Sequence, residues 1–232
     1  MKFLIEDSNK IDLHIHTNFS DGRDFPIEII RQALNLNLNY IAFADHMVDE
    51  ARFLCGKLKR WKQEFDLKII PACELCVKYK NKRIHLLAYN YNPLFRQMVL
   101  PVINKKFSKD EEMTLKKACN LIHMFGGKAV LAHPFKYNCN AKELVEDILK
   151  EKCIDGIECI HAYHTQEEID YLLDICEKNA LYVTAGSDYH YQGRNIRGVG
   201  KQNIIGELPG SYSTIEQQLM RAKEKYITTN KR

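Results

Sequence analysis

Two histidines one residue apart, His14 and His16, end a short apolar run, and the turn sequence Ser20-Asp21-Gly22 follows them. In an extended strand alternate side chains point to the same side, so the two imidazoles share one face. Imidazoles at a strand end, followed by a turn carboxylate, are suited to binding a metal ion. A His-x-His pair arises by chance about a third of a time per chain of this histidine content, so its meaning depends on the other polar residues.

Apolar, β-branched runs alternate with segments of helical periodicity along the chain. Strands are predicted over residues 11–15, 40–44, 68–72, 84–89, 129–132, 156–160 and 181–185. Helices are predicted over residues 26–37, 49–65, 94–125, 141–152, 166–179 and 213–224. This alternation is typical of parallel strands joined by crossover helices, and it predicts an α/β fold.

The length of 232 residues suits a single α/β barrel, and we find no repeat, low-complexity segment or linker that would divide the chain. We therefore expect one domain over residues 1–232. Residues 94–112 have the weakest pattern, with Pro101 and a lysine-rich patch at 105–109, and are interpreted as a broken helix or a small lid.

The composition is that of a soluble globular protein, with 45% hydrophobic and 28% charged residues. No apolar run has the length of a signal-peptide core or a membrane span, and eight cysteines without a secretory signal are expected to stay reduced. We expect a cytoplasmic protein with no membrane partner. The formal charge of +4, with scattered cations, predicts no stable nucleic-acid coat but is compatible with a small anionic substrate.

Most of the histidines and several carboxylates fall where a predicted strand ends. In a parallel barrel these ends open on one face, where barrel enzymes carry their chemistry. Imidazole and carboxylate ligands without thiolates suit Zn²⁺, Mn²⁺ or Fe²⁺ better than Ca²⁺ or Mg²⁺. The sequence therefore predicts a multinuclear metal site at the C-terminal ends of the strands. The residues placed there are His14, His16, Asp45, His46, Glu74, His133, Asp188 and His190, with His85 inside the fourth strand.

Taken in order, these motifs resemble the Polymerase and Histidinol Phosphatase (PHP) family of metal-dependent phosphoesterases. The resemblance covers about residues 10–200 and implies a distorted (β/α)7 barrel with a trinuclear metal centre in its mouth. The matching motifs are Asp-Leu-His-Ile-His-Thr at 12–17, Ser-Asp-Gly at 20–22, Ala-Asp-His at 44–46, Glu74, His85, Ala-His-Pro at 132–134, Gly-Ile-Glu at 156–158 and Gly-Ser-Asp-Tyr-His at 186–190.

The resemblance also implies the ligands of up to three divalent ions, Mn, Zn or Fe. The first ion would be bound by His14, His16, Glu74 and Asp188. Glu74 would bridge to a second ion, which is also bound by His85 and His133. The third ion would be bound by Asp21, His46 and His190.

We therefore expect a hydrolase of phosphate esters, a phosphatase or phosphodiesterase that uses a metal-bridging hydroxide. Asp21 in its turn resembles the nucleotide-directed branch of the family, which favours small nucleotides or oligonucleotide ends as substrates. The 47 residues between His85 and His133 are too few for the full helical insert of that branch, so two alternatives stay open. One is a histidinol-phosphate phosphatase, and the other is a non-catalytic, metal-binding regulatory module.

The sequence indicates less clearly which side chains protonate the leaving group, orient the ligands or bind the substrate. One of His161 and His164 is a candidate to protonate the leaving oxygen, against a structural role. Asp12 and Asp45 would orient imidazoles or, equally, cap nearby backbone. Loop cations would grip a non-reacting phosphate or, alternatively, stay in solvent; they are Lys136, Arg194, Arg197 and Arg23.

Overall fold

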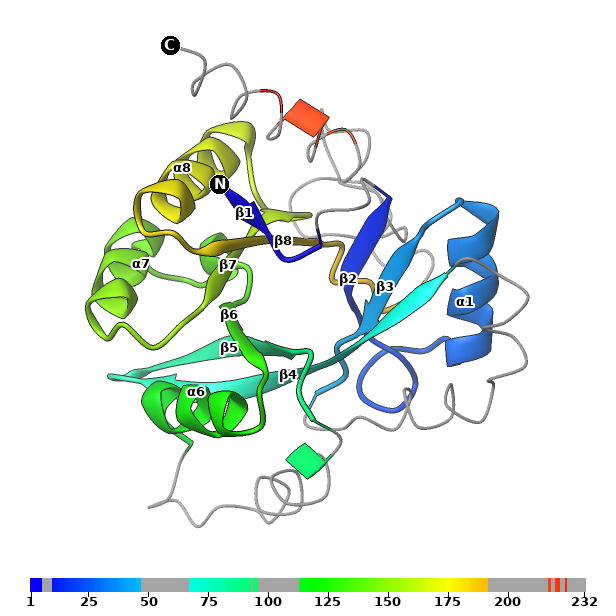
Figure 1. Ribbon diagram of the computed structural model, residues 1–232, viewed down its shortest axis with the longest axis horizontal. Helices are drawn as coiled ribbons and strands as arrows, with labels where there is room; N and C mark the ends of the chain where they lie inside the picture. The colour runs from blue at the N-terminus through cyan, green and yellow to red at the C-terminus, as the bar shows by residue number, and fades with distance from the viewer. Residues whose placement is uncertain are drawn as a thin grey trace.

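The computed structural model describes residues 1–5, 10–46, 67–92, 94–95, 113–191, 217, 220–221 and 224. Its strands are β1 (Lys2–Phe3), β2 (Ile11–Ile15), β3 (Tyr40–Phe43), β4 (Lys68–Tyr79), β5 (Lys82–Tyr89), β6 (Lys128–Leu131), β7 (Gly156–His161) and β8 (Tyr182–Gly186). They form one sheet in the order β1-β8-β7-β6-β5-β4-β3-β2, which curls into a barrel-like arc (Figure 1). The predicted α/β barrel is confirmed, with the short β1 as an additional strand.

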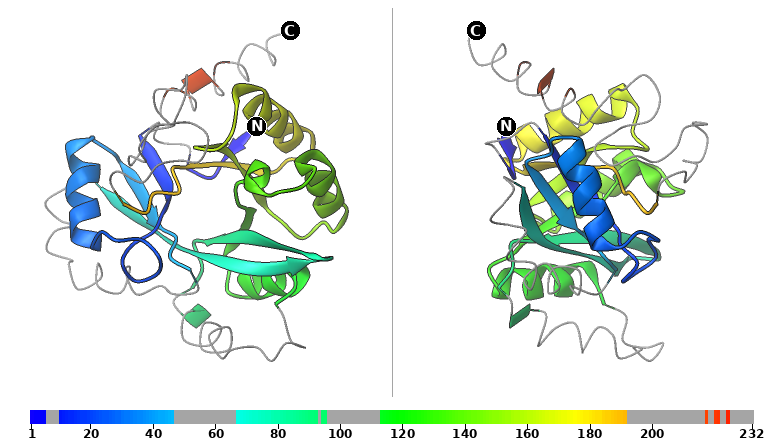
Figure 2. Two further views of the ribbon diagram at one scale, coloured as in Figure 1. Left: turned by 180° about the vertical axis from the view of Figure 1, so that it is seen from behind. Right: turned by 90° about the vertical axis from the view of Figure 1, so that its right-hand side faces the viewer.

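The helices lie around the outer side of the curled sheet, as the three views of Figures 1 and 2 agree. They are α1 (Pro26–Asn35), α6 (Leu115–Met124), α7 (Ala141–Lys150) and α8 (Gln166–Lys178), with a 3-10 turn, η1 (Pro134–Lys136), after β6. Helix α8 begins with a capping box, in which the Glu168 N–H donates to Thr165 Oγ1 and the Thr165 N–H donates to Glu168 Oε2. Side-chain caps also begin α6 (Thr114) and α7 (Asn140), and they fix where these helices start and thereby the lengths of the loops that precede them.

The expectation of an all-parallel sheet was wrong for β5, which runs antiparallel to both β4 and β6. The predicted third strand ended at residue 72, whereas β4 continues to Tyr79 and turns into β5 through two residues. A two-residue connection cannot make a parallel crossover, and Lys80 takes a positive φ of 52° to close the hairpin. Glu74 therefore lies inside a strand and not after one.

The C-terminal end of β2 meets the segment that follows β8. Ile15 forms an isolated parallel bridge with Tyr189, and the His16 N–H donates to the Tyr189 carbonyl oxygen at 2.8 Å. The Tyr189 side chain is fully buried in a small cluster with Ile15, Ile29 and Phe43, beneath α1. Its neighbours in sequence lie beside His16, with Asp188 Oδ1 at 3.3 Å from His16 Nε2 and the His190 ring centroid at 4.3 Å from that of His16.

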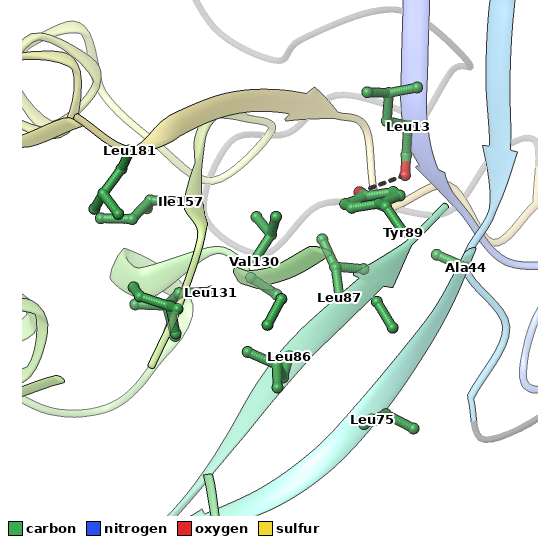
Figure 3. Packing of buried hydrophobic residues seen from close by; sticks show 14 of the residues in the cluster. Leu13, Ala44, Leu75, Leu86, Leu87, Tyr89, Val130, Leu131, Ile157 and Leu181 are labelled. Carbon is green, nitrogen blue, oxygen red and sulfur yellow. Dashed lines mark hydrogen bonds between the residues drawn. The ribbon is translucent and has the colours of Figure 1, made fainter. Parts of the chain in front are cut away.

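The main core joins side chains of β4, β5, β6 and β7 to the buried faces of α6, α7 and α8, and Figure 3 shows part of it. Leu75, Leu86, Leu87 and Val130 are at most 2% exposed, and each such side chain contributes roughly 1.5–3 kcal/mol by burial. Tyr89 is also buried, and its hydroxyl donates to the Leu13 carbonyl oxygen at 2.8 Å, which ties β5 to β2 across the interior. A rigid, packed floor thus lies below the strand ends.

Several predictions fall on residues that the structure does not describe. The predicted helix over 49–65 lies outside the described residues, as do nearly all of the 94–112 segment and most of the 213–224 helix. Within the described residues, no helix combines the length and apolarity needed to cross a membrane.

Candidate metal centre

The side chains predicted for the first metal lie together at the end of β2. His14 and His16 are fully buried, and their Nε2 atoms lie 3.1 Å apart. Asp188 Oδ1 lies 3.6 Å from the first of these nitrogens and 3.3 Å from the second. The two oxygens of Glu74 lie 3.5 Å from His14 Nε2 and 3.4 Å from His16 Nε2.

Three of these separations, among His14 Nε2, His16 Nε2 and Asp188 Oδ1, match the edges of a metal-binding tetrahedron. Ligand atoms bound tetrahedrally at 2.0–2.1 Å are separated by about 3.3 Å, and these three distances are 3.1, 3.3 and 3.6 Å. These three donors can hold one ion, while Glu74 presents a different oxygen to each imidazole, and all four residues are of the types that borderline divalent metals prefer. The residues therefore fit a metal ion.

Glu74 links this group to a second one. Its Oε1 atom lies 2.8 Å from His85 Nδ1 and 3.0 Å from His133 Nε2, so the predicted second set is also brought together. Against the lowering effect of burial, hydrogen bonds with Cys76 and Glu74 raise the pKa of His85 to about 9. Burial lowers the pKa of His133 to about 3, which leaves this imidazole neutral and available as a ligand.

The predicted third set lies at the rim of the mouth and is less closed. Asp21 Oδ2 lies 3.1 Å from His190 Nε2 and 3.8 Å from His46 Nε2, while the other nitrogen of His46 lies 3.2 Å from Glu74. His46 therefore faces both the second and the third groups. The Asp21 side chain is 55% exposed, so this end of the centre opens to solvent.

The carboxylates of the centre are held in their ionised form. Burial alone would raise the pKa of Glu74, but His14 and the other imidazoles hold it well below its usual range. Asp188 behaves similarly, because Lys136 and the histidines outweigh the effect of burial and lower its pKa. In His16, hydrogen bonds with Asp188 and Glu74 outweigh burial and raise the pKa to about 9. The centre thus attracts positive charge, and bound protons compete with metal ions for it.

Two of the predicted ligands have an unusual backbone. His133 (φ 27°) and Asp188 (φ 53°) both take positive φ, a conformation that costs a non-glycine residue about 1–3 kcal/mol. His133 follows the end of β6 by two residues, and Asp188 follows the end of β8 by two residues. The sharp turn at each strand end directs the side chain into the mouth, as expected where function maintains the strain.

Asp12 and Asp45 hold the chain around the centre. Asp12 accepts hydrogen bonds from the Ser187 N–H (3.0 Å) and hydroxyl (2.6 Å), and Asp45 accepts hydrogen bonds from the Thr17 N–H (2.7 Å) and the Ser20 hydroxyl (2.6 Å). These contacts correspond to the backbone-capping alternative of the sequence analysis. They fix the loops that precede Asp188 and Asp21.

Sequence reasoning assigned no role to Glu158, which contacts an imidazole ring from outside the three predicted ligand sets. Glu158, in β7, is fully buried, and its carboxylate lies 3.0 Å from His14 Nδ1. It also accepts the backbone N–H of His133 at 3.0 Å. Its sequence signals were a single acidic residue inside an apolar strand and its place in the matching Gly-Ile-Glu motif, and neither indicated the contact with His14.

The predicted substrate-binding cations have different surroundings. Lys136 Nζ lies 2.5 Å from Asp188 Oδ2 and 5.3 Å from the centroid of the Tyr163 ring, inside the mouth. Arg23 is exposed, and its guanidinium lies over the Tyr191 ring at 3.9 Å. Arg194 and Arg197 lie outside the described residues.

The two candidate acids differ in tautomer. The Tyr163 N–H donates to His161 Nδ1 at 3.1 Å, so in the neutral ring the proton is on Nε2. This Nε2 has no hydrogen-bond partner among the described residues and lies 4.0 Å from Asp188 Oδ2. His164 instead donates from Nδ1 to the Cys159 carbonyl oxygen at 2.8 Å, and its ring packs against Phe135.

Comparison with known proteins agrees with this arrangement. The sequence profile of the PHP domain matches residues 12–185. The 5'-3' exoribonuclease Rnm of Escherichia coli is 22% identical over 77% of this chain and 84% of its own length. The 3',5'-nucleoside bisphosphate phosphatase of Chromobacterium violaceum is 30% identical over a shorter stretch, 38% of this chain and 31% of its own length.

A solved structure shares the fold. The Bifidobacterium adolescentis protein, which is assigned as a metal-dependent phosphoesterase, superposes with a TM-score of 0.63 at 20% identity, over 91% of this chain and 94% of its own. Since the profile match spans most of the chain and includes the strands that carry the donor cluster, this chain belongs to the PHP domain family of metal-dependent phosphoesterases.

Proposed function

We propose that this protein hydrolyses phosphate esters of small nucleotides or of oligonucleotide ends, with up to three divalent ions (Mn, Zn or Fe) in its barrel mouth. The observation that carries the proposal is the convergence of His14, His16 and Asp188 at separations close to those of a tetrahedral site, with one oxygen of Glu74 beside each of the two imidazoles. The proposed ligands are the nine predicted ones: His14, His16, Asp21, His46, Glu74, His85, His133, Asp188 and His190.

Bound divalent ions would supply the Lewis acidity and the water activation that phosphoester hydrolysis requires. The chain's own contribution is to hold the donors rigidly. Glu74 contacts imidazoles from several strands, and the loops that carry the other ligands are tied down by Asp12 and Asp45. The open rim near Asp21 is the side from which an ester would enter.

The nucleotide assignment rests on the relatives. The E. coli relative is named as a 5'-3' exoribonuclease and the C. violaceum relative as a nucleoside bisphosphate phosphatase, so both names describe phosphoesters of nucleosides. In this chain, Lys136 is positioned to exchange its contact with Asp188 for a substrate phosphate. Arg23 is a second candidate beside His190, whose carbonyl oxygen accepts the Arg23 N–H, and Arg194 and Arg197 stay in the proposal from their sequence position.

The proposed role of His161 is to donate a hydrogen bond to the reacting phosphate or the leaving oxygen. Burial, with His133 and His164 nearby, lowers the pKa of His161 well below its usual value, so the ring is neutral. A neutral Nε2–H is a good hydrogen-bond donor but a poor proton source. His164 is the less favoured candidate, because its described contacts are with Cys159, Phe135 and His161.

The test is a substrate panel. Metal-free protein is reloaded with Mn²⁺, Zn²⁺ or Fe²⁺ and offered an aryl monoester, an aryl diester, a nucleoside 3',5'-bisphosphate, a 5'-phosphorylated RNA oligomer and histidinol phosphate. We expect the protein to hydrolyse the nucleotide esters. This hydrolysis should be abolished by chelation and absent in Glu74→Ala. If the protein binds metal but cleaves none of the panel, the catalytic proposal fails and the regulatory-module alternative is favoured.

A further inference from the structure

Glu158 is a fully buried carboxylate that no ligand set uses. It lies in β7, with Oε1 at 3.0 Å and Oε2 at 3.2 Å from His14 Nδ1, across 144 residues of sequence. The Oε2 atom also accepts the backbone N–H of His133 at 3.0 Å. One carboxylate therefore contacts two of the proposed ligands, one through its ring and the other through its backbone.

This contact determines which nitrogen of His14 can bind a metal. A carboxylate acceptor at Nδ1 keeps the ring proton on that side and leaves Nε2 with a free lone pair. That Nε2 is the atom that faces His16, Glu74 and Asp188 at 3.1 to 3.6 Å. With a metal ion bound at Nε2, the three groups would form a carboxylate–histidine–metal triad, in which the outer carboxylate fixes both the orientation and the basicity of the ring.

Glu158 could alternatively bind a cation directly, since it forms a donor group with His14 and His161. The hydrogen bonds argue against this. His161 Nδ1 accepts the Tyr163 N–H, which places the remaining ring proton on Nε2, the atom that would have to bind the ion. The carboxylate itself is surrounded by N–H donors, and a cation would displace both of them.

The neighbouring strand β8 leaves room for the contact between His14 and Glu158. A Cβ atom added to Gly186 in β8 would lie 2.2 Å from the His14 Cβ and 2.7 Å from Glu158 Oε1. Only a glycine at this position lets the ring and the carboxylate meet. The space for the contact is thus provided by a strand that donates neither group.

We propose that Glu158 is the positioning residue of the metal centre, which holds His14 as an Nε2 ligand and fixes the His133 backbone relative to it. This inference rests on the proposed metal centre but not on its substrate. It follows that replacing the carboxylate weakens metal binding while the barrel still folds.

The test compares Glu158→Gln with Asp155→Asn. Asp155 directly precedes β7, the strand that contains Glu158. Its carboxylate also accepts a backbone N–H, that of Ala129 in β6, at 2.8 Å. It lies at the opposite end of the barrel from the metal centre. A glutamine offers a single carbonyl oxygen, so one of the two N–H donors at position 158 loses its acceptor. We expect Glu158→Gln to lower the Zn²⁺ affinity about 10- to 100-fold in a chelator competition titration, and Asp155→Asn to leave it unchanged.

If folded Glu158→Gln binds Zn²⁺ as tightly as the unaltered protein, the inference is overturned while the proposed function stands. If the unaltered protein binds no metal, both fail. A measurement on the unaltered Zn²⁺-loaded protein covers the case in which the variant does not fold. Long-range ¹H–¹⁵N correlation spectra should show the His14 proton on Nδ1, and a proton on Nε2 would refute the proposal.

Discussion

The Nε2 atoms of His14 and His16 lie 3.1 Å apart in a part of the barrel from which solvent is excluded. Two bare imidazole lone pairs at this separation repel one another, so a ring proton or a cation must lie between or beside them. A proton serves in the metal-free protein, and a divalent ion fits the same place.

Glu74→Ala should remove the acid that contacts five histidines of the centre. We expect fewer bound metal ions by elemental analysis and a loss of hydrolysis of roughly 10²- to 10³-fold, the scale of one electrostatic group in an active site. Glu146→Ala, on the exposed side of α7, is the control and should change neither quantity. Full metal occupancy in Glu74→Ala would contradict its assignment as the shared ligand.

The stability of the metal-free protein should fall as pH rises from 6.5 to 9. The pKa of His16 is about 9 in the fold against 6.5 in the unfolded chain, so its contribution is fully present below 6.5 and is lost as pH passes 9. Glu74 acts at the other end, because its lowered pKa contributes stability that is lost as pH falls below its unfolded value of 4.5. Thermal unfolding temperatures, measured in the presence of a chelator across the pH range, test both the alkaline and the acidic loss of stability.

Metal affinity should change in the opposite direction over the same alkaline window. Metal ions displace the protons that His16 and His85 hold up to a pH of about 9, so binding strengthens as pH rises. A pH series of Zn²⁺ competition titrations tests this. An affinity that is flat between pH 6.5 and 9 would show that the protons and the metal do not share a site.

Gly186→Ala should damage both the fold and the centre. The new methyl group would overlap His14 and Glu158, and overpacking of this kind costs about 1–3 kcal/mol. Gly156→Ala is a matched control, since its Cβ would lie 2.6 Å from the Tyr182 carbonyl oxygen at the far end of the same strand pair. We expect both variants to unfold at lower temperature, but only Gly186→Ala to lose Zn²⁺ affinity.

His161 can be tested by replacing its donor in two ways. His161→Gln retains an N–H near the position of Nε2, whereas His161→Leu removes it. If the ring acts as a hydrogen-bond donor, we expect the leucine variant to lose roughly 10²- to 10³-fold in kcat and the glutamine variant much less. Equal losses in both variants, larger for nucleoside esters than for nitrophenyl esters, would instead indicate a general acid.

Most of the centre could be predicted because its residues follow strands of strongly apolar pattern. His46 after β3, His133 after β6 and Asp188 after β8 were recognisable as polar groups at the ends of buried runs. Strand direction was not recognisable in the same way. No hairpin turn was predicted between residues 72 and 84, and the strands on either side were expected to be parallel, so the reversal of β5 and the position of Glu74 within a strand were missed.

Glu158 was beyond the reach of sequence reasoning for a different reason. Its role depends on the distance to His14 and on the absence of a side chain at Gly186, and both are properties of strand packing. Tautomers are equally invisible in sequence, because the acceptor at His14 and the donor at His161 come from other strands or from the backbone.

The bridge between Ile15 and Tyr189 joins the first and last of the strand ends that carry ligands. During synthesis, the early histidines therefore leave the ribosome long before their acidic partners exist. A nascent chain offers an ion only an incomplete set of donors until β8 has emerged and docked, so the complete donor set forms only at a late stage of folding.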